Sequence, residues 1–298
     1  MESRRYKKSL GSKIFDVFNT IFMILLIIIM VYPFINQLAI SFNDSADAVK
    51  GGIYLWPRKL SFDAYKFIFA QNSLIKATFV SIARVLVGTA TSVIATALLA
   101  YIVTIKGFSG RKFMRRLFVI TMYLSGGLIP FYLLMVKLHL INTFSIYWVP
   151  GIFSAYNMLI IAAYMQEIPN AISESARIDG ANEVTIFWKV MLPMCIPVIA
   201  AICVFNGVGH WNDWFTSVVY NPSGKWDTLQ VYLRKVLLET EALEKIRDQQ
   251  MAARQYSSLT PKTVQAAITM IVTIPIAMIY PLFQKYFISG ITIGAVKE

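Results

Sequence analysis

The sequence predicts an all-α, polytopic membrane protein with six transmembrane helices and one long polar loop on the cytoplasmic side. Of its 298 residues, 57% are hydrophobic and only 15% are charged, whereas a soluble domain carries about 25% charged residues. The mean hydropathy is +0.58. A helix needs about 20 mostly apolar residues to cross a bilayer. Residues 1–298 therefore form a single predicted transmembrane domain with spans at 17–42, 74–104, 115–138, 144–165, 193–219 and 263–287.

Basic residues beside the spans predict the orientation. The net charge of +12 could suggest nucleic-acid binding, but five Lys/Arg precede the first span and five crowd the loop 105–116, which is how membrane topology is encoded. Six spans then place both termini and the loop 167–192 in the cytoplasm. The long segments 43–73 and 220–262 lie outside. The second carries seven Lys/Arg, an exception we accept because long translocated segments obey the charge rule weakly.

The first span is predicted to stay in the mature protein. A basic, amphipathic leader at residues 1–16 precedes it and is expected at the inner membrane surface. Its apolar stretch is long, and no small-x-small cleavage site follows closely. We therefore expect a retained anchor rather than a cleaved signal peptide.

The second span carries a charged residue, Arg84, on the same face as a series of small residues. Gly88, Ser92, Thr96 and Ala100 recur every four residues on one face, where helix backbones can approach closely. Arg84 lies one turn earlier on the same face. It could extend to the lipid headgroups, or it could line a substrate path and pair with a neighbour. We favour the second interpretation because charges within spans usually face the bundle interior.

Two spans contain residues that interrupt helices. Gly126 and Gly127 precede Pro130 in the third span, and Asn206 to Gly209 lie in the fifth. Irregular backbone at membrane depth is tolerated where it lines a cavity or is buried in protein. These positions are therefore candidates for a substrate path, with simple packing kinks as the alternative.

An aromatic and polar cluster follows at the outer end of the fifth span. It runs from His210 to Phe215 and contains the candidate path residues Trp211, Asn212, Asp213 and Trp214. One interpretation is an interfacial aromatic belt. The other is a rim that binds sugars, because flat rings stack on pyranose faces while Asn212 and Asp213 can bond to hydroxyl groups.

Several kinds of chemistry find no support in the sequence. There is no phosphate-binding Gly-x4-Gly-Lys-Ser/Thr loop, so we expect neither ATP nor Mg²⁺ to be bound by this chain. His139 and His210 are the two histidines, and they lack metal-ligand spacing. Cys195 and Cys203 lie on one apolar helix and are interpreted as small buried hydrophobic residues. We predict no catalytic residue and no metal site.

The polar loop 167–192 predicts two short helices joined by a hinge. Pro169 suits a first helical turn, and Glu174 lies near that positive end of the helix. Gly180 supplies the backbone freedom needed to end the first helix. Pro193 is expected to close the second helix. An amphipathic elbow between two spans is suited to contact another protein.

The same loop resembles the EAA loop of ABC-importer permeases. That family's pattern is Glu-Ala-Ala, three residues, Gly, nine residues, an aliphatic residue, any residue, then Leu-Pro. The spacing agrees throughout, although Ser175 replaces the middle alanine and Val190 the usual isoleucine. The resemblance implies a cytoplasmic coupling loop that docks into a groove on an ATPase. The residues it assigns to coupling are Glu174, Ser175, Ala176, Asp179, Gly180, Leu192 and Pro193.

Other motifs resemble the polysaccharide and complex-oligosaccharide branch of the maltose-type permeases. They are the Gly127–Pro130 segment, Trp211-Asn212, Tyr280-Pro281 and the tail from Gly290 to Lys297. This resemblance implies a sugar importer in the bacterial inner membrane. It also implies a second, homologous permease subunit, two ATPase subunits that bind ATP and Mg²⁺, and an extracellular solute-binding protein. The alternative is a stand-alone channel or an ion-coupled carrier.

Overall fold

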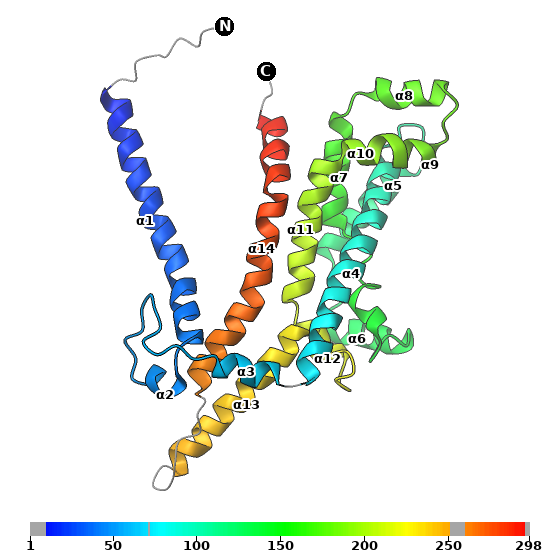
Figure 1. Cartoon of the computed structure of the whole chain (residues 1–298). Coiled ribbons are helices and arrows are strands. Elements are labelled where there is room, and N and C mark those ends of the chain that lie inside the picture. Colours follow the sequence, from blue (N-terminus) through cyan, green and yellow to red (C-terminus); the bar gives the residue numbers. More distant parts are fainter. Residues whose placement is uncertain (1–9, 71, 251–259, 296–298) are drawn as a thin grey trace. The chain divides into compact units, whose positions relative to one another are not determined.

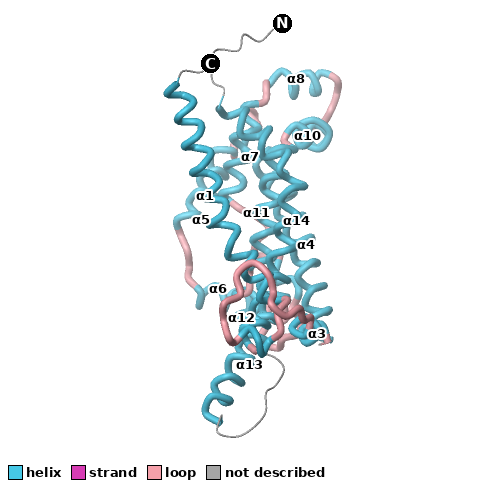
Figure 2. Tube along the Cα trace, turned by 60° about the vertical axis from the view of Figure 1, so that its left-hand side comes forward, coloured by secondary structure: helices cyan, strands magenta, loops and turns pink. Residues whose placement is uncertain are grey.

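The computed structural model describes residues 10–70, 72–250 and 260–295, and no strand occurs in these ranges (Figures 1 and 2). The chain forms two compact units, Met1–Ala70 with Val236–Thr273 and Gln71–Lys235 with Ile274–Glu298. Most of the predicted basic leader, the segment 251–259 of the second outer loop and the last three residues of the tail lie outside the described residues.

The first unit is built around the long helix α1. Nearly all apolar side chains of α1 are exposed except in its last turn, as expected for a helix whose solvent is lipid. A small core of Ala39, Ile40, Ala48, Ile53 and Ala266 packs beyond that turn. The helices of this unit are α1 (Leu10–Ser41), α2 (Ser45–Ala48), α3 (Asp63–Phe69), the later part of α13 (Leu229–Gln250) and the first part of α14 (Pro261–Ala295).

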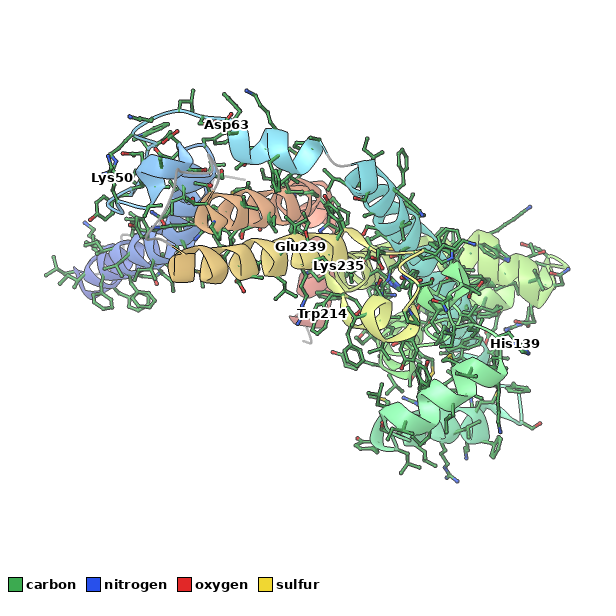
Figure 3. The ribbon with its side chains drawn as sticks, turned by 90° about the horizontal axis from the view of Figure 1, so that it is seen from below. Lys50, Asp63, His139, Trp214, Lys235 and Glu239 are labelled. Carbon is green, nitrogen blue, oxygen red and sulfur yellow. The ribbon has the colours of Figure 1, made fainter. Side chains whose placement is uncertain are left out.

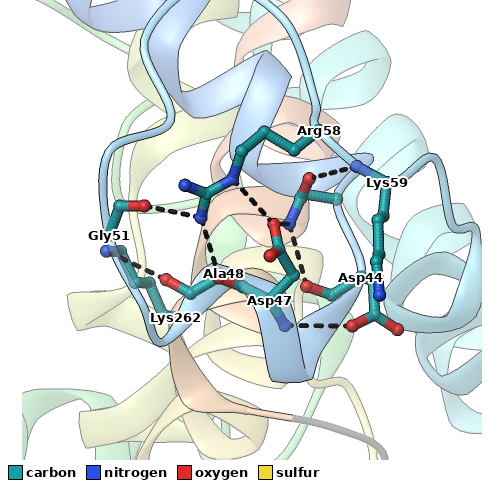
Figure 4. A network of polar contacts seen from close by, with 8 residues as sticks. Asp44, Asp47, Ala48, Gly51, Arg58, Lys59 and Lys262 are labelled. Atoms are coloured by element: carbon teal, nitrogen blue, oxygen red, sulfur yellow. Dashed lines mark hydrogen bonds and ion pairs between the residues drawn. The ribbon is translucent and has the colours of Figure 1, made fainter.

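A polar network fixes the start of the predicted first outer loop (Figure 4). Arg58 Nε donates to Asp47 Oδ2 at 2.9 Å, and its Nη2 donates to the carbonyl oxygens of Asp47 at 3.1 Å and Gly51 at 2.7 Å. The side chain of Asn43 donates to Asp47 Oδ2 at 3.1 Å and accepts from the backbone amide of Lys59 at 3.0 Å. One arginine and one asparagine therefore hold two stretches of loop together.

The second unit is organised around α4, which packs against α7 and α11. Its main core joins the C-terminal half of α4, α7 and the helices of loop 167–192 through side chains such as Ala97, Met158, Ile161 and Phe187. Besides the first part of α13 and the later part of α14, the elements of this unit are α4 (Asn72–Thr104), α5 (Arg111–Tyr123), α6 (Leu128–Lys137), η1 (Phe144–Tyr147), α7 (Ala155–Glu167), α8 (Asn170–Ile178), α9 (Glu183–Ile186), η2 (Phe187–Met191), α10 (Leu192–Met194), α11 (Ile196–Asn212) and α12 (Phe215–Tyr220).

The helix lengths support a polytopic membrane protein without fixing six spans. Among the described residues, three helices are long and apolar enough to cross a bilayer, in α1, α4 and α14, and a bent pair gives a fourth. The third predicted span is divided into α5 and α6. The fourth is represented by α7, which has 13 residues, and the preceding 3₁₀ turn η1. The count of six spans therefore stays a prediction.

The break expected in the third span is present. Helix α5 ends at Tyr123 and α6 begins at Leu128, and Figure 2 shows the connecting loop. Gly127 has a φ of +80°, which residues with a Cβ rarely adopt. The predicted glycine interruption is confirmed here.

The interruption expected at residues 206–209 of the fifth span is wrong. Helix α11 runs through this stretch, and the chain instead bends by 80° between Met194 and Ile196. Pro193 and Pro197 flank the bend, and each removes an amide donor that a continuous helix would need. Gly207 packs against α4 instead, where an added Cβ would lie 3.8 Å from side-chain atoms of Val85 and Thr89.

Candidate functional site

The elbow consists of α8 and a second helical piece running from α9 to α10. Figure 1 shows it at one end of α4, with α12 at the other end. Glu174, Ser175 and Ala176 all lie in α8. Pro169 stands one residue before the first turn, as the residue that caps it. The second piece extends past Leu192 and Pro193 to Met194, so it is slightly longer than predicted.

Gly180 ends α8 by forming a Schellman turn. Its φ is +82°, and its amide donates to the carbonyl of Arg177 at 3.1 Å. The next amide, of Ala181, donates to the carbonyl of Ala176 at 3.0 Å. This pair of bonds satisfies the last carbonyl groups of the helix and requires a left-handed residue at this position. The predicted role of Gly180 in ending the helix is confirmed, and Asp179 caps the helix just before it.

Helix α9 begins with a local cap. The Asn182 side chain accepts a hydrogen bond from the backbone amide of Thr185 at 2.8 Å. Such a cap satisfies one of the orphan amides of the first turn. Glu183 occupies the first helical position, where the helix dipole favours a carboxylate.

Glu183 joins both elbow helices to α4. Its Oε1 accepts from Arg177 Nε at 2.8 Å, and its Oε2 accepts from the Tyr101 hydroxyl at 2.5 Å. Tyr101 is itself buried. The pKa of Glu183 lies below its ordinary value, chiefly because Arg177 donates to the carboxylate. A displacement of the elbow would therefore act directly on the end of α4.

The outward surface of the elbow is apolar, with a polar cavity behind it. Ile178, Val184 and Trp188 are exposed large hydrophobic side chains. Glu174 is exposed and lines a cavity of about 530 Å³ with Arg177 and other residues of α4, α7 and α8. Exposed apolar side chains rimmed by polar ones are typical of protein-interaction surfaces.

A second cavity lies beside the middle of α4. Its volume is about 480 Å³, within the range of about 300–1,000 Å³ for small-ligand sites. Polar and aromatic side chains from α4, α6, α11, α12 and the segment 146–154 converge on it. The polar members are Arg84, Ser92, Tyr147, Ser154, Asn206, His210, Asp213 and Thr216, and the aromatic ones besides Tyr147 are Phe131, Phe153, Phe205 and Tyr220.

Arg84 is the central charge of this cavity and has the interior position predicted for it. It is 2% exposed, and its Nη1 donates to the carbonyl of Asp213 at 2.7 Å while Nη2 donates to Asp213 Oδ2. Its guanidinium carbon lies 4.6 Å from the centre of the Tyr147 ring, a cation–π contact. Thr216 also donates to Asp213 through its amide and hydroxyl. The buried charge is therefore paired and held in place.

A second polar chain crosses the cavity. Asn206 accepts from Asn157 Nδ2 at 3.1 Å and donates to Ser92 Oγ at 3.5 Å. The three residues come from α11, α7 and α4. The small-residue face of α4 thus provides both close helix packing and a polar wall.

The other predicted path residues lie elsewhere. Gly126 and Gly127 form the break between α5 and α6 and do not line the cavity. Asn212 accepts from Gln230 Nε2 at 3.4 Å. Arg234 stacks 3.9 Å above the ring of Trp214, which Figure 3 labels beside α13. Trp211 is likewise not among the lining residues.

Most of the lining residues are not predicted from the sequence, which identifies Arg84, Asn206 and Asp213. Tyr147, Ser154 and Thr216 belong to no recognisable motif, because they come from segments that are distant in the sequence and meet only in the folded chain. His210 belongs to the sequence cluster at the end of the fifth span, but the sequence predicts no role for it in the path. Its ring packs on Gly88, where an added Cβ would lie 2.5 Å from Nε2.

Comparisons with known proteins agree with this architecture. Residues 1–225 match the family described as "Binding-protein-dependent transport system inner membrane component". The polygalacturonan/rhamnogalacturonan transport system permease protein YtcP of Bacillus subtilis (strain 168) is 34% identical over 288 residues, covering 96% of this chain and 99% of that protein. The arabinooligosaccharides transport system permease protein AraQ of Halalkalibacterium halodurans is 29% identical over 278 residues, covering 90% and 92%.

A solved structure is similar over nearly the whole chain. It is a crystal structure of a bacterial ABC transporter involved in the import of the acidic polysaccharide alginate. One of its chains has a TM-score of 0.84 and 27% sequence identity, covering 95% of this chain and 99% of that one. The resemblance to ABC-importer permeases is confirmed at the level of the family. The chain belongs to the family of binding-protein-dependent transport system inner membrane components.

Proposed function

We propose that this chain is the transmembrane permease subunit of an ATP-driven importer for oligosaccharides or polysaccharide fragments. The observation that carries the proposal is that α4 joins an elbow with an exposed apolar surface to a polar and aromatic cavity. The named relatives are permeases for polygalacturonan/rhamnogalacturonan and for arabinooligosaccharides, which favours a sugar polymer as the substrate class.

The elbow is proposed to dock on a cytoplasmic ATPase. Ile178, Val184 and Trp188 offer apolar area for a groove on the partner. When ATP closes the ATPase dimer, the elbow moves as a rigid body, and the contact between Glu183 and Tyr101 passes the displacement to α4. ATP and Mg²⁺ belong to the two ATPase subunits. This chain contributes Glu174, Ser175, Ala176, Asp179, Gly180, Leu192 and Pro193 to the coupling surface.

The cavity is proposed to be part of the sugar path. The exposed rings of Phe131, Phe153 and Phe205 can stack on pyranose faces, while Asn206 and Asp213 can bond to hydroxyl groups. Binding at this position is productive only if the bundle exposes the cavity alternately to the two sides. The Arg84–Asp213 pair connects α4 to the end of α11 and is positioned to sense that change.

The proposed assembly contains four kinds of component. This chain, with six spans and with both termini and the elbow in the cytoplasm, pairs with a second, homologous permease. Two ATPase subunits bind the elbows from the cytoplasm. An extracellular solute-binding protein delivers the sugar to the outer segments 43–73 and 220–262. Each of these contacts rests on membership of the family and on the surfaces described above.

The test is affinity purification from native membranes, with the tag in the outer segment 220–262 so that the elbow and the tail remain free. We expect a second permease and an ATPase to co-purify in stoichiometric amounts. Removing the apolar elbow surface by Trp188→Ser should release the ATPase but leave the second permease bound. Recovery of the chain alone as a stable oligomer would instead indicate a self-sufficient channel or carrier.

A further inference from the structure

A small basic pocket lies where α4 ends and α5 begins. Its volume is about 310 Å³, at the lower limit of small-ligand sites. It is separate from the sugar cavity and adjoins the elbow, because Thr104, Lys106 and Gln166 also line the cavity behind α8. The lining residues are Val103, Thr104, Lys106, Arg111, Lys112, Arg115 and Gln166.

The positive charge of this pocket is not neutralised. In the part of the chain that the structure describes, none of its four Lys/Arg side chains forms an ion pair. Glu167 adjoins the lining residue Gln166 in sequence but does not line the pocket. Arg111 and Arg115 are like charges four residues apart, an arrangement that destabilises a helix. The protein therefore maintains a cluster of repelling cations around a cavity.

The start of α5 adds to this charge. Arg111 is its first residue, and the preceding Gly110 provides no side-chain cap. The positive end of the helix dipole therefore points at the same place as the cations. The Arg111 amide already donates to the Phe108 carbonyl. An anion with several acceptor oxygens could accept hydrogen bonds from the side chains and from the next two amides of the first turn, those of Lys112 and Phe113.

An apolar strip continues from the pocket along α5. Val119 and Met122 lie one and two turns beyond Arg115 on the same face. Met122 is 43% exposed and Val119 is half-buried. The pocket also lies at the end of α4, where its apolar run stops at Thr104. A charged pocket that leads into an apolar strip at the end of a spanning helix suits an amphiphile better than a free ion.

We propose that this pocket binds the headgroup phosphate of an anionic phospholipid, with an acyl chain lying along Val119 and Met122. Basic pockets between helices at the cytoplasmic side of a membrane are suited to such headgroups. The bound headgroup would fill the pocket lined by the end of α4, the start of α5 and Gln166 of α7. It would lie beside the elbow, because three of these lining residues also line the cavity behind α8.

The test uses the purified, complete importer, delipidated in detergent and titrated with phosphatidylglycerol or with phosphatidylcholine while bound lipid is counted by native mass spectrometry. Arg115→Gln and Arg116→Gln form a matched pair. Both residues are exposed on α5 and both variants lose one charge, but only Arg115 lines the pocket. We expect Arg115→Gln, and likewise Lys112→Gln, to weaken phosphatidylglycerol binding about fivefold, with less than a twofold effect of Arg116→Gln.

Three outcomes would overturn the proposal. Equal weakening by Arg115→Gln and Arg116→Gln would indicate general attraction to a basic surface. Equal retention of phosphatidylcholine and phosphatidylglycerol would exclude recognition of the anionic headgroup. Displacement of the lipid by inorganic phosphate alone would assign the pocket to a free anion.

Discussion

At the scale of single residues, Arg84 shows how a membrane protein makes a buried charge tolerable. The side chain is almost fully buried, and among the described residues its Nε has no hydrogen-bond partner. Its other two nitrogens donate hydrogen bonds to the carbonyl and carboxylate of Asp213. The guanidinium group also makes a cation–π contact with the Tyr147 ring. Losing one partner of a buried pair leaves an uncompensated charge, which costs far more than the pair itself contributes.

We predict that Asp213→Asn destabilises the protein by about 3 kcal/mol. The amide keeps the shape of the side chain but leaves the Arg84 charge without a counter-ion. The measurement is the thermal unfolding midpoint of the purified complex in detergent. Asp227→Asn is the matched control, because its partner Lys235 is 55% exposed while the Arg84 side chain is 3% exposed. Equal shifts in the two variants would show that the Arg84 charge is not buried.

Glu183 gives a prediction for pH dependence. The folded elbow holds the pKa of Glu183 below its ordinary value of 4.5, chiefly through the Arg177 hydrogen bond. The contact therefore stabilises the elbow fully above that ordinary value, and the stabilisation is lost as the pH falls through the lowered folded value. Glu183→Gln should speed hydrogen exchange of the elbow amides at pH 7, and this effect should diminish as the pH is lowered below 4.5. A difference that persists unchanged at the lower pH would contradict the role of the carboxylate.

The sequence could predict the interior position of Arg84 but not its partner. Arg84 shares a helical face with Ser92 and Thr96, which periodicity alone reveals. Asp213 lies 129 residues away, and its approach depends on the packing of α11 against α4. The same limit applies to Tyr147, whose ring contacts Arg84 from the 3₁₀ turn η1, a segment with no recognisable sequence pattern.

At the scale of elements, the contact between α4 and α11 depends on two glycines with different tolerances. An alanine Cβ at position 88 would lie 2.5 Å from the His210 ring, whereas at position 207 it would lie 3.8 Å from its nearest neighbours. We predict that Gly88→Ala destabilises by about 1–3 kcal/mol and that Gly207→Ala is tolerated. Thermal unfolding of both variants checks this, and Gly88→Ala/His210→Ala should recover part of the loss. No recovery in the double variant would mean that another contact sets the helix spacing.

The turn at Gly180 is predicted to control coupling. A β-branched residue at a φ of +82° costs about 1–2 kcal/mol, and it would change how α8 and α9 are held. Gly180→Val should therefore reduce sugar uptake relative to ATP hydrolysis. Asparagine tolerates this backbone region better, so Gly180→Asn should keep more of the coupling. The ratio of uptake to hydrolysis in proteoliposomes is the measurement, and an unchanged ratio in Gly180→Val would refute the role of the turn.

Helix breaks were predictable to different degrees. The Gly-Gly-x-x-Pro pattern located the loop between α5 and α6, because glycine has a local backbone preference that needs no tertiary context. In the fifth span the glycines of residues 206–209 serve close packing with α4, and the bend of 80° lies near Pro193 and Pro197. Glycine occurs both at helix breaks and where two helices pack closely. The sequence alone therefore does not show which of the two a glycine marks, because that depends on whether a neighbouring helix packs against it.

At the scale of the whole molecule, two sites are connected by one helix. The second unit places the elbow at one end of α4 and the proposed sugar cavity beside the middle of that helix, with Tyr101 and Arg84 as the respective contacts. The elbow could be predicted from the sequence because its characteristic residues lie at fixed intervals within one continuous segment. The residues that line the cavity could be predicted only in part, because they come from five separate segments of the chain.

The most direct test of this account is reconstitution in liposomes. The chain and its partner permease would be reconstituted with or without the ATPase, and uptake of labelled oligosaccharides would be measured in the presence of ATP and the binding protein. The account predicts uptake only when the ATPase is present, together with strong loss of uptake in Glu183→Gln and Gly180→Val. Uptake of the same size without the ATPase would contradict it, since the chain would then be a channel or a self-sufficient carrier.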